Sequence, residues 1–198
     1  ARWGLVPPWA KELAVGSRAF NARSETVLEK PMFRQAIKRR RCALPIPGYY
    51  EWEVTEDGKQ PWMMSAAGAD PLFMAGLFEF WKQPDDAWLV STSILTMESA
   101  GHLREVHDRM PVFLTEDAVG DWLVPGKLEP EQKDPLLAQL DQVSTAMAAE
   151  LVTVPVELSI APEKLPSSTN EIVFHVRSVD DESINDDADS RFIGPSIR

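Results

Sequence analysis

The sequence has 198 residues, of which 44% are hydrophobic, with one cysteine and a formal net charge of −11. This length favours one domain with its own core. The single cysteine excludes an internal disulfide, and no apolar run is long enough for a membrane span, so we expect a soluble, cytoplasmic protein.

The charge is distributed unevenly along the chain. Residues 1–41 carry ten Lys/Arg and three acidic residues, a net of +7, whereas the other 157 residues carry ten basic and 28 acidic residues, a net of −18. A basic face of this kind can bind phosphate while the acidic remainder maintains solubility. The alternative interpretation is a solvated helix face without a ligand.

The first forty residues alternate short apolar segments with turns. The segment Trp3–Trp9 (WGLVPPW) predicts a strand end that runs into a rigid loop at Pro7-Pro8. Ser24 is placed to cap a short helix, and Pro31 suits the first turn of a second helix that ends in the basic run Lys38–Arg41.

From residue 44 the sequence acquires a period of two, which is typical of strands. Asp57-Gly58 is a strong hairpin signal, and Gly76 predicts a bulge or a close approach of two backbones. We expect four strands here, at residues 44–54, 62–64, 72–81 and 88–96.

The second half mixes helices with short strands. Thr115 is expected to cap a helix that runs through Trp122. Further helices are expected at 98–106, 136–140 and 145–151, with strands at 112–114 and 152–156. Hairpins with segregated helices predict an α+β fold, a mostly antiparallel, barrel-like sheet with surrounding helices. We expect a single domain over residues 1–179 and an acidic, poorly ordered tail over 180–198.

Two residues are candidates for acid–base chemistry. Glu51 lies between Tyr50 and Trp52, and a carboxylate in apolar surroundings has a raised pKa. His107 lies in a polar loop beside Asp108, a suitable place for a general acid or base. The alternatives are a solvated strand carboxylate and a structural histidine.

Other residue types suggest binding to nucleic acid. Asn21 and Arg23, two residues apart, can clamp a phosphate and a sugar hydroxyl, although Asn is also common in turns. Tryptophans beside basic groups can stack on bases or pack in a core, and for Trp3 we expect the core. Cys42 is either a small buried hydrophobe, the favoured interpretation, or a nucleophile. No HExxH or CxxC motif indicates a metal site.

Five motifs in order resemble one family. They are WGLVPPW, NARSET, RRCALPIPGYYEW, STSILTMES and HDRMPVFL, within Arg2 to Val156. Together they resemble the SRAP family, the SOS-response-associated peptidases, whose animal relatives shield abasic sites in DNA. The resemblance implies binding of single-stranded DNA at abasic sites and a covalent thiazolidine link through an N-terminal cysteine, which self-removal of the initiator Met exposes. It implies no cofactor, metal or membrane partner, implies nothing about oligomers, and implies association with the nucleoid if the protein is bacterial.

The resemblance also implies roles for individual residues. The expected catalytic residues, which hold the cysteine or move protons, are Asn21, Glu51, His107 and Thr96. The expected DNA-binding residues are Trp9, Arg23, Trp52 and Arg109. Cys42 matches the RRC position of the family, which looks structural.

The N-terminal motif of the family, Met-Cys-Gly-Arg, does not occur in this sequence, which starts Ala1-Arg2-Trp3. Two explanations stay open: a preceding segment that carries the nucleophile, or a truncated relative. Two rival functions also stay open. One is a non-catalytic module that binds single-stranded DNA, and the other is a peptidase that acts on other proteins.

Overall fold

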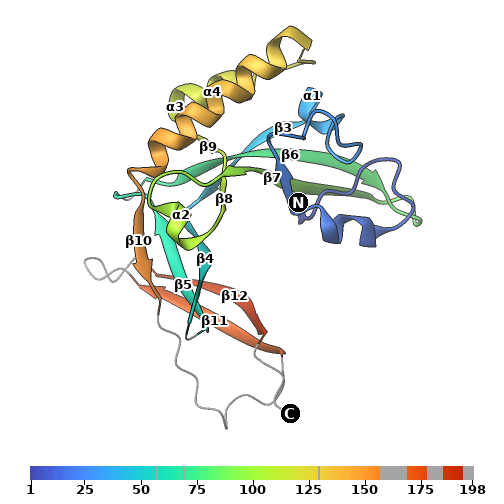
Figure 1. Cartoon of the computed structure of the whole chain (residues 1–198). Coiled ribbons are helices and arrows are strands. Elements are labelled where there is room, and N and C mark those ends of the chain that lie inside the picture. The colour runs from blue at the N-terminus through green and yellow to red at the C-terminus, as the bar shows by residue number, and fades with distance from the viewer. Residues whose placement is uncertain (57, 69, 129, 157–168, 178–184, 194–198) are drawn as a thin grey trace. The chain divides into compact units, whose positions relative to one another are not determined.

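In the computed structural model, two long antiparallel strands, β6 (Leu72–Lys82) and β7 (Trp88–Glu98), form the centre of the main sheet (Figure 1). Both are rich in aromatic and β-branched residues, which suit a pleated and largely buried surface. β3 (Arg41–Ile46) pairs antiparallel with β6, and with β1 (Arg2–Trp3) it completes the order β1-β7-β6-β3. The strands expected at 72–81 and 88–96 are therefore confirmed.

Four short strands extend β7 and β6. β1 (Arg2–Trp3) and β2 (Asn21–Arg23) run parallel to β7, while β8 (Arg109–Pro111) pairs antiparallel with it. β9 (Phe113–Leu114) pairs with β6. Thr96 on β7 is opposite Arg23 on one side and Pro111 on the other. This register brings three distant segments of the chain side by side.

A second, three-stranded antiparallel sheet has the order β10-β5-β4 (Figure 1). It consists of β4 (Gly48–Thr55), β5 (Gly58–Ser65) and β10 (Val152–Pro155). The expected hairpin is confirmed, since Thr55 is opposite Gly58, whose φ of 130° suits glycine. Asp57, the other residue of that signal, lies outside the described residues.

The helices agree less closely with the sequence-based expectations. They are η1 (Leu13–Arg18), α1 (Ala36–Arg39), α2 (Leu103–Val106), α3 (Glu116–Trp122) and α4 (Pro130–Ala148). Thr115 caps α3 as expected, its hydroxyl accepting from the Ala118 N–H at 3.3 Å. The helix expected after Ser24 is wrong, because that segment forms turns. The two helices expected at 136–140 and 145–151 are one continuous helix, α4, because no glycine or proline interrupts its second half.

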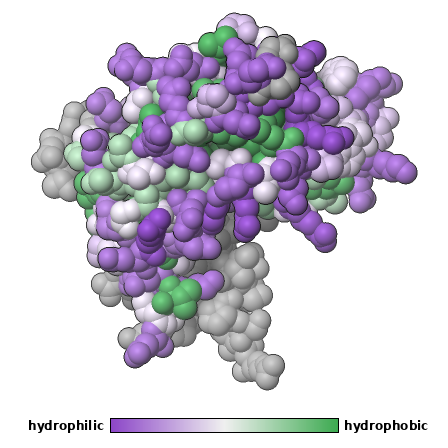
Figure 2. Space-filling view, turned by 45° about the horizontal axis from the view of Figure 1, so that its top comes forward, coloured by the Kyte–Doolittle hydropathy of each residue, from purple (hydrophilic) through white to green (hydrophobic). Residues whose placement is uncertain are grey.

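The core lies largely between the main sheet and its helices. Gly76 on β6 allows a close approach, since a Cβ atom there would lie 2.8 Å from Cys42 Sγ on β3. A hydrogen bond connects α4 to β9, because the Ser144 hydroxyl accepts from the Phe113 N–H at 2.8 Å. Hydrophilic side chains cover most of the face shown in Figure 2, with smaller apolar patches between them. None of the described helices has the length and apolar character that crossing a membrane requires.

The structure describes residues 1–56, 58–68, 70–128, 130–156, 169–177 and 185–193. The chain divides into two units, residues 1–156 and 157–198. In the second unit β11 (Thr169–Arg177) pairs antiparallel with β12 (Asn185–Ile193). The expected boundary at 179/180 stays a prediction, because residues 178–184 lie outside the described residues. Of the expected tail, only the segment in β12 is described.

The α+β class and the mostly antiparallel pairing are confirmed. The described strands of the first unit form open sheets, with β1 and β3 at the ends of the main path, so they do not close into a barrel. The reason lies in the pairing: β4 and β5 join β10 instead of extending the main sheet.

Candidate active site

One face of the main sheet and the start of β4 enclose a cavity of about 460 Å³. We call it the first cavity. Six of the eight predicted site residues line it: Asn21, Arg23, Glu51, Thr96, His107 and Arg109. Trp9 and Trp52 do not line it. The fold therefore gathers these six side chains from four separate segments: β2, β4, β7 and residues 107–109.

Strand pairing explains why Asn21 and Arg23 face the cavity. They alternate with the buried Ala22, so both point to the same side of β2. The parallel register sets Asn21 beside Ile94 and Arg23 beside Thr96, and neighbours in register share one face of a sheet. This face therefore offers an amide, a guanidinium and a hydroxyl in one row.

Glu51 enters the cavity from β4. Burial raises the pKa of the Glu51 carboxyl above its ordinary value, His107 nearby lowers it, and the negative charge of Asp108 raises it. Burial also raises the pKa of Tyr49, and the charge of Glu51 adds to that effect. A carboxyl with a raised pKa beside a histidine is suited to accepting and returning a proton near neutral pH.

Main-chain groups fix the ring of His107. Its Nδ1 lies 3.0 Å from the Arg109 N–H and 3.0 Å from the Arg109 carbonyl oxygen. If Nδ1 accepts from the N–H, Nε2 carries the proton of the neutral ring; if Nδ1–H donates to the carbonyl, Nε2 is a base. The same anchor thus serves both roles of an acid–base histidine.

The side chain of Arg109 is held by an ion pair that connects distant parts of the chain. Its two terminal nitrogens donate to the Glu25 carboxylate at 2.6 and 3.0 Å, and Nη2 also donates to the Thr96 carbonyl at 2.7 Å. The hydrogen bond from Arg109 is the main reason that the pKa of Glu25 is lowered. Sequence reasoning missed Glu25, because nothing local in NARSET indicates a partner 84 residues away.

The tryptophans lie in different places. Trp52 is 49% exposed and, by alternation along β4, lies on the opposite side of the strand from Glu51. Trp9 is 58% exposed and lines a second cavity of about 510 Å³. Trp3 is 44% exposed and lines the first cavity, so its expected place in the core is wrong. The reason is that β1 lies at the edge of the sheet, with Trp3 beside Thr92.

Cys42 lines neither cavity. Its Sγ lies 3.9 Å from Thr92 Oγ1, and burial raises the pKa of its thiol, which disfavours the nucleophilic thiolate. This agrees with its interpretation as a small packed residue. In the part of the chain that the structure describes, no group of three His, Cys, Asp or Glu residues is arranged to hold a metal ion.

Comparisons with known proteins identify relatives of this chain. The sequence profile of the SOS response associated peptidase (SRAP) family matches residues 1–160. Abasic site processing protein YoqW of Bacillus subtilis is 37% identical over 141 residues, which is 71% of this chain and 63% of that protein. Abasic site processing protein HMCES of Rattus norvegicus is 32% identical over 174 residues, covering 72% of this chain and 49% of that protein. The chain thus spans 63% and 49% of the length of these two relatives.

Solved structures show the same fold. A protein from Bacteroides thetaiotaomicron superposes with a TM-score of 0.65 at 26% identity, covering 78% of this chain and 67% of that one. A protein from Bordetella bronchiseptica gives a TM-score of 0.63 at 26% identity, covering 80% and 76%. A second profile, described as an IG-like fold at the C-terminus of FixG, matches residues 127–195. Such folds are β-sandwiches, whereas this segment contains the 19-residue helix α4, so the structure does not support that match.

Proposed function

The chain belongs to the SOS response associated peptidase family, and from this membership and the first cavity we propose that it processes abasic sites in single-stranded DNA. The relatives named as abasic site processing proteins support the substrate class. The observation that carries the proposal is the meeting of Glu51 and His107 in a cavity rimmed by Arg23, Asn21 and Thr96.

The proposed chemistry joins the sugar to an N-terminal cysteine outside these 198 residues. The closed hemiacetal first opens to an aldehyde, as its C1 hydroxyl loses a proton and the ring oxygen gains one. The α-amine then adds to the aldehyde carbon, and loss of water leaves a Schiff base. Addition of the thiol to that carbon closes the thiazolidine, with the thiol proton passing to nitrogen. The balance is one water released, without an oxidant or reductant.

Glu51 and His107 are proposed to move the protons in these steps. A carboxyl whose pKa is raised by burial can take the proton of the C1 hydroxyl and return it to the departing oxygen. His107, held by main-chain groups in either tautomer, can assist ring opening and loss of water. Asn21 and Thr96 would hold the cysteine and the sugar, and the same Glu51 would activate water for removal of the initiator Met.

Arg23 and Arg109 are proposed to contact the phosphates that flank the lesion. Arg109 is already oriented by Glu25 and by the Thr96 carbonyl, which reduces the entropy lost when a phosphate binds. Trp52, which is exposed on β4 beside the cavity, is proposed to stack on a neighbouring base. An abasic site has no base to unstack, so a wedge there costs less.

The test is adduct formation by the full-length protein with the Met-Cys start of the family. We expect a heat-stable adduct on a denaturing gel with a single-stranded oligonucleotide that carries one abasic site, and none with the intact strand. Replacement of the N-terminal cysteine by alanine is the control and should abolish the adduct. Strand binding without an adduct would instead favour a non-catalytic module, and cleavage of a protein substrate without DNA would favour a peptidase.

A further inference from the structure

The second cavity lies on the opposite face of the main sheet from the first. Its floor includes Glu79, which is opposite Ser91 in the β6–β7 register, whereas Ile94 and Thr96 of the first cavity are on the alternate face. The lining comes from the loop after β1, from α1 with the segment that leads into it, from β6 and from the loop after α3. It comprises Pro7, Pro8, Trp9, Pro31, Met32, Gln35, Lys38, Arg39, Arg40, Glu79 and Lys127.

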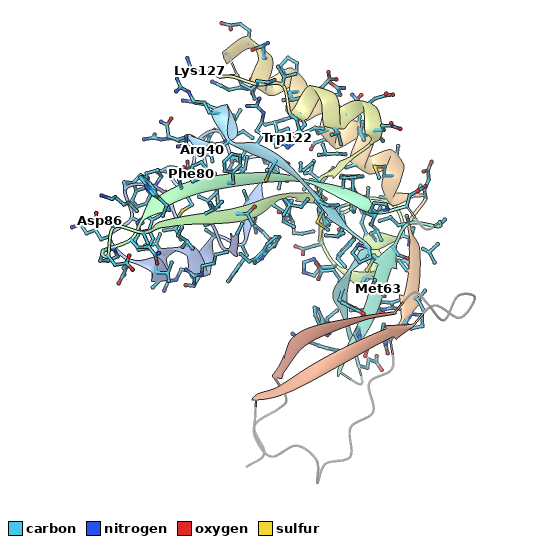
Figure 3. All side chains as sticks on the ribbon, turned by 180° about the vertical axis from the view of Figure 1, so that it is seen from behind. Arg40, Met63, Phe80, Asp86, Trp122 and Lys127 are labelled. Atoms are coloured by element: carbon cyan, nitrogen blue, oxygen red, sulfur yellow. The ribbon has the colours of Figure 1, made fainter. Side chains whose placement is uncertain are left out.

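The charges on this cavity are mostly positive. Four cationic side chains line it, against the single carboxylate of Glu79. Glu79 is only 1% exposed and accepts from Arg40 Nε at 2.6 Å. Burial raises the pKa of Glu79, and Arg40 lowers it again. Figure 3 shows Arg40 and Lys127 on the same side of the sheet as the long helix.

The buried carboxylate orients Arg40 instead of neutralising the whole cavity. A guanidinium has five N–H donors, and only Nε of Arg40 has a partner among the described contacts. An arginine fixed from behind by a carboxylate keeps a planar set of donors for a second anion. Lys38 and Arg39, in the last turn of α1, add two further positive charges beside Arg40.

Trp9 adds an aromatic surface to these charges. It is 58% exposed, and the preceding Pro7-Pro8 restricts its backbone. Exposed aromatic rings beside a row of cations are the features by which proteins bind single-stranded nucleic acid without reading its sequence. A small inorganic anion would contact the cationic side chains but not the ring of Trp9, whereas a nucleotide would contact both.

We propose that the second cavity binds the phosphates and one base of a single-stranded polynucleotide at nucleotides away from the abasic site. This inference rests on the proposed function and extends its footprint. Trp3 lines the first cavity and Trp9 the second. Six residues of chain reach at most about 20 Å, so a strand can pass from one cavity to the other around the edge of the sheet at β1.

The experiment measures equilibrium binding of an intact single-stranded oligonucleotide of about 20 nucleotides, longer than the site of one compact domain. The full-length double variant Lys38→Gln/Arg39→Gln is compared with Lys30→Gln/Arg34→Gln. The second pair removes the same charge from exposed positions of the same segment that do not line the cavity. We expect the slope of log affinity against log salt to fall by about 1.4 for the first pair, at about 0.7 per phosphate contact, and to stay unchanged for the second. Equal slopes for the two double variants would overturn the proposal.

A second variant keeps the proposal testable if the charge changes disturb folding. Trp9→Ala should weaken binding of the same strand at least about fivefold, whereas Trp88→Ala, at an exposed tryptophan of neither cavity, should not. Equal affinities of the two tryptophan variants would contradict the inference. Because the oligonucleotide is intact, the outcome is independent of adduct formation. If the adduct forms but the variants bind the strand like their controls, only the proposed role of the second cavity is refuted. If the variants bind differently from their controls but no adduct forms, only the proposed reaction is refuted.

Discussion

Each cavity contains a glutamate whose pKa is raised by burial, although Glu79 is fully buried and Glu51 only half-buried, and the partners of the two glutamates differ. Glu79 in the second cavity is bound directly by Arg40 at 2.6 Å. Glu51 in the first cavity forms no ion pair among the described residues, and it lies near His107 and Asp108, whose effects on its pKa oppose each other. Burial alone therefore does not determine the role of a carboxylate. A fixed cation makes it a positioning group, and a nearby histidine makes it a proton carrier.

The largest expected effect is on the rate of adduct formation. Glu51→Gln cannot exchange a proton, so we expect a loss of about 10²- to 10⁴-fold in rate with nearly unchanged strand affinity. The matched control is Glu53→Gln on the same face of β4, whose carboxylate accepts from Trp62 Nε1 at 2.9 Å. Rates come from quenched time courses on denaturing gels. An equal loss of binding and rate in Glu51→Gln would mean that Glu51 is structural.

The same substitution in the second cavity should act on folding. Glu79→Gln replaces a charge-assisted hydrogen bond to Arg40 by a neutral one in a buried place. We expect the free energy of unfolding to fall by about 1.5–3 kcal/mol, measured by urea denaturation. An unchanged free energy would show that Glu79 does not hold Arg40, and the contrast between the two cavities would then fail.

Replacement of Cys42 tests whether a thiol outside both cavities contributes to adduct formation. Cys42→Ala should leave adduct formation unchanged, because Sγ lines neither cavity and burial raises the pKa of the thiol. We expect the free energy of unfolding to fall by about 0.5–1.5 kcal/mol, the usual cost of removing one buried heavy atom. Abolition of the adduct in a folded Cys42→Ala protein would restore the nucleophile interpretation.

The smallest expected effects are in the pH dependence of stability, and they have opposite signs for two carboxylates. The folded-state pKa of Glu51 is raised, so its contribution is fully present below about pH 4 and is lost as pH rises through the folded pKa. Glu51→Gln should therefore gain stability relative to the unmodified protein on going from acid to neutral pH.

Glu25 should behave in the opposite way. Its folded-state pKa is lowered by Arg109, so its contribution is present above about pH 4 and is lost as pH falls through the folded pKa. Glu25→Gln should lose at most about 1 kcal/mol at neutral pH, because the pair is partly exposed, and nothing in strong acid. Urea denaturation at a series of pH values checks both signs, and parallel curves for the two variants would contradict the assignment.

Much of the local structure could be predicted from the sequence. The period of two in GYYEWEV predicted the strand β4, although the single strand expected at 44–54 is divided between β3 and β4. Asp57-Gly58 predicted the hairpin, and Thr115 predicted the start of α3. Strand alternation, a tight turn and a helix cap each depend on residues that are close together in the sequence, so the local sequence is enough to predict them. Glu51 and His107 were identifiable for the same reason, because their immediate neighbours suggested their chemistry.

What the tertiary structure decided was the set of partners and faces. Only the register of β2, β7 and β8 brought Arg23, Thr96 and Pro111 into one row. The ion pair between Glu25 and Arg109 and the separation of Trp3 from Trp9 into different cavities followed from the same arrangement. The physical reason is that a shift of one residue in register moves a side chain to the other face of a sheet, and register between distant strands is set by the packing of the whole core. The sequence by itself therefore determined which residues could do chemistry, and the fold determined which of them meet.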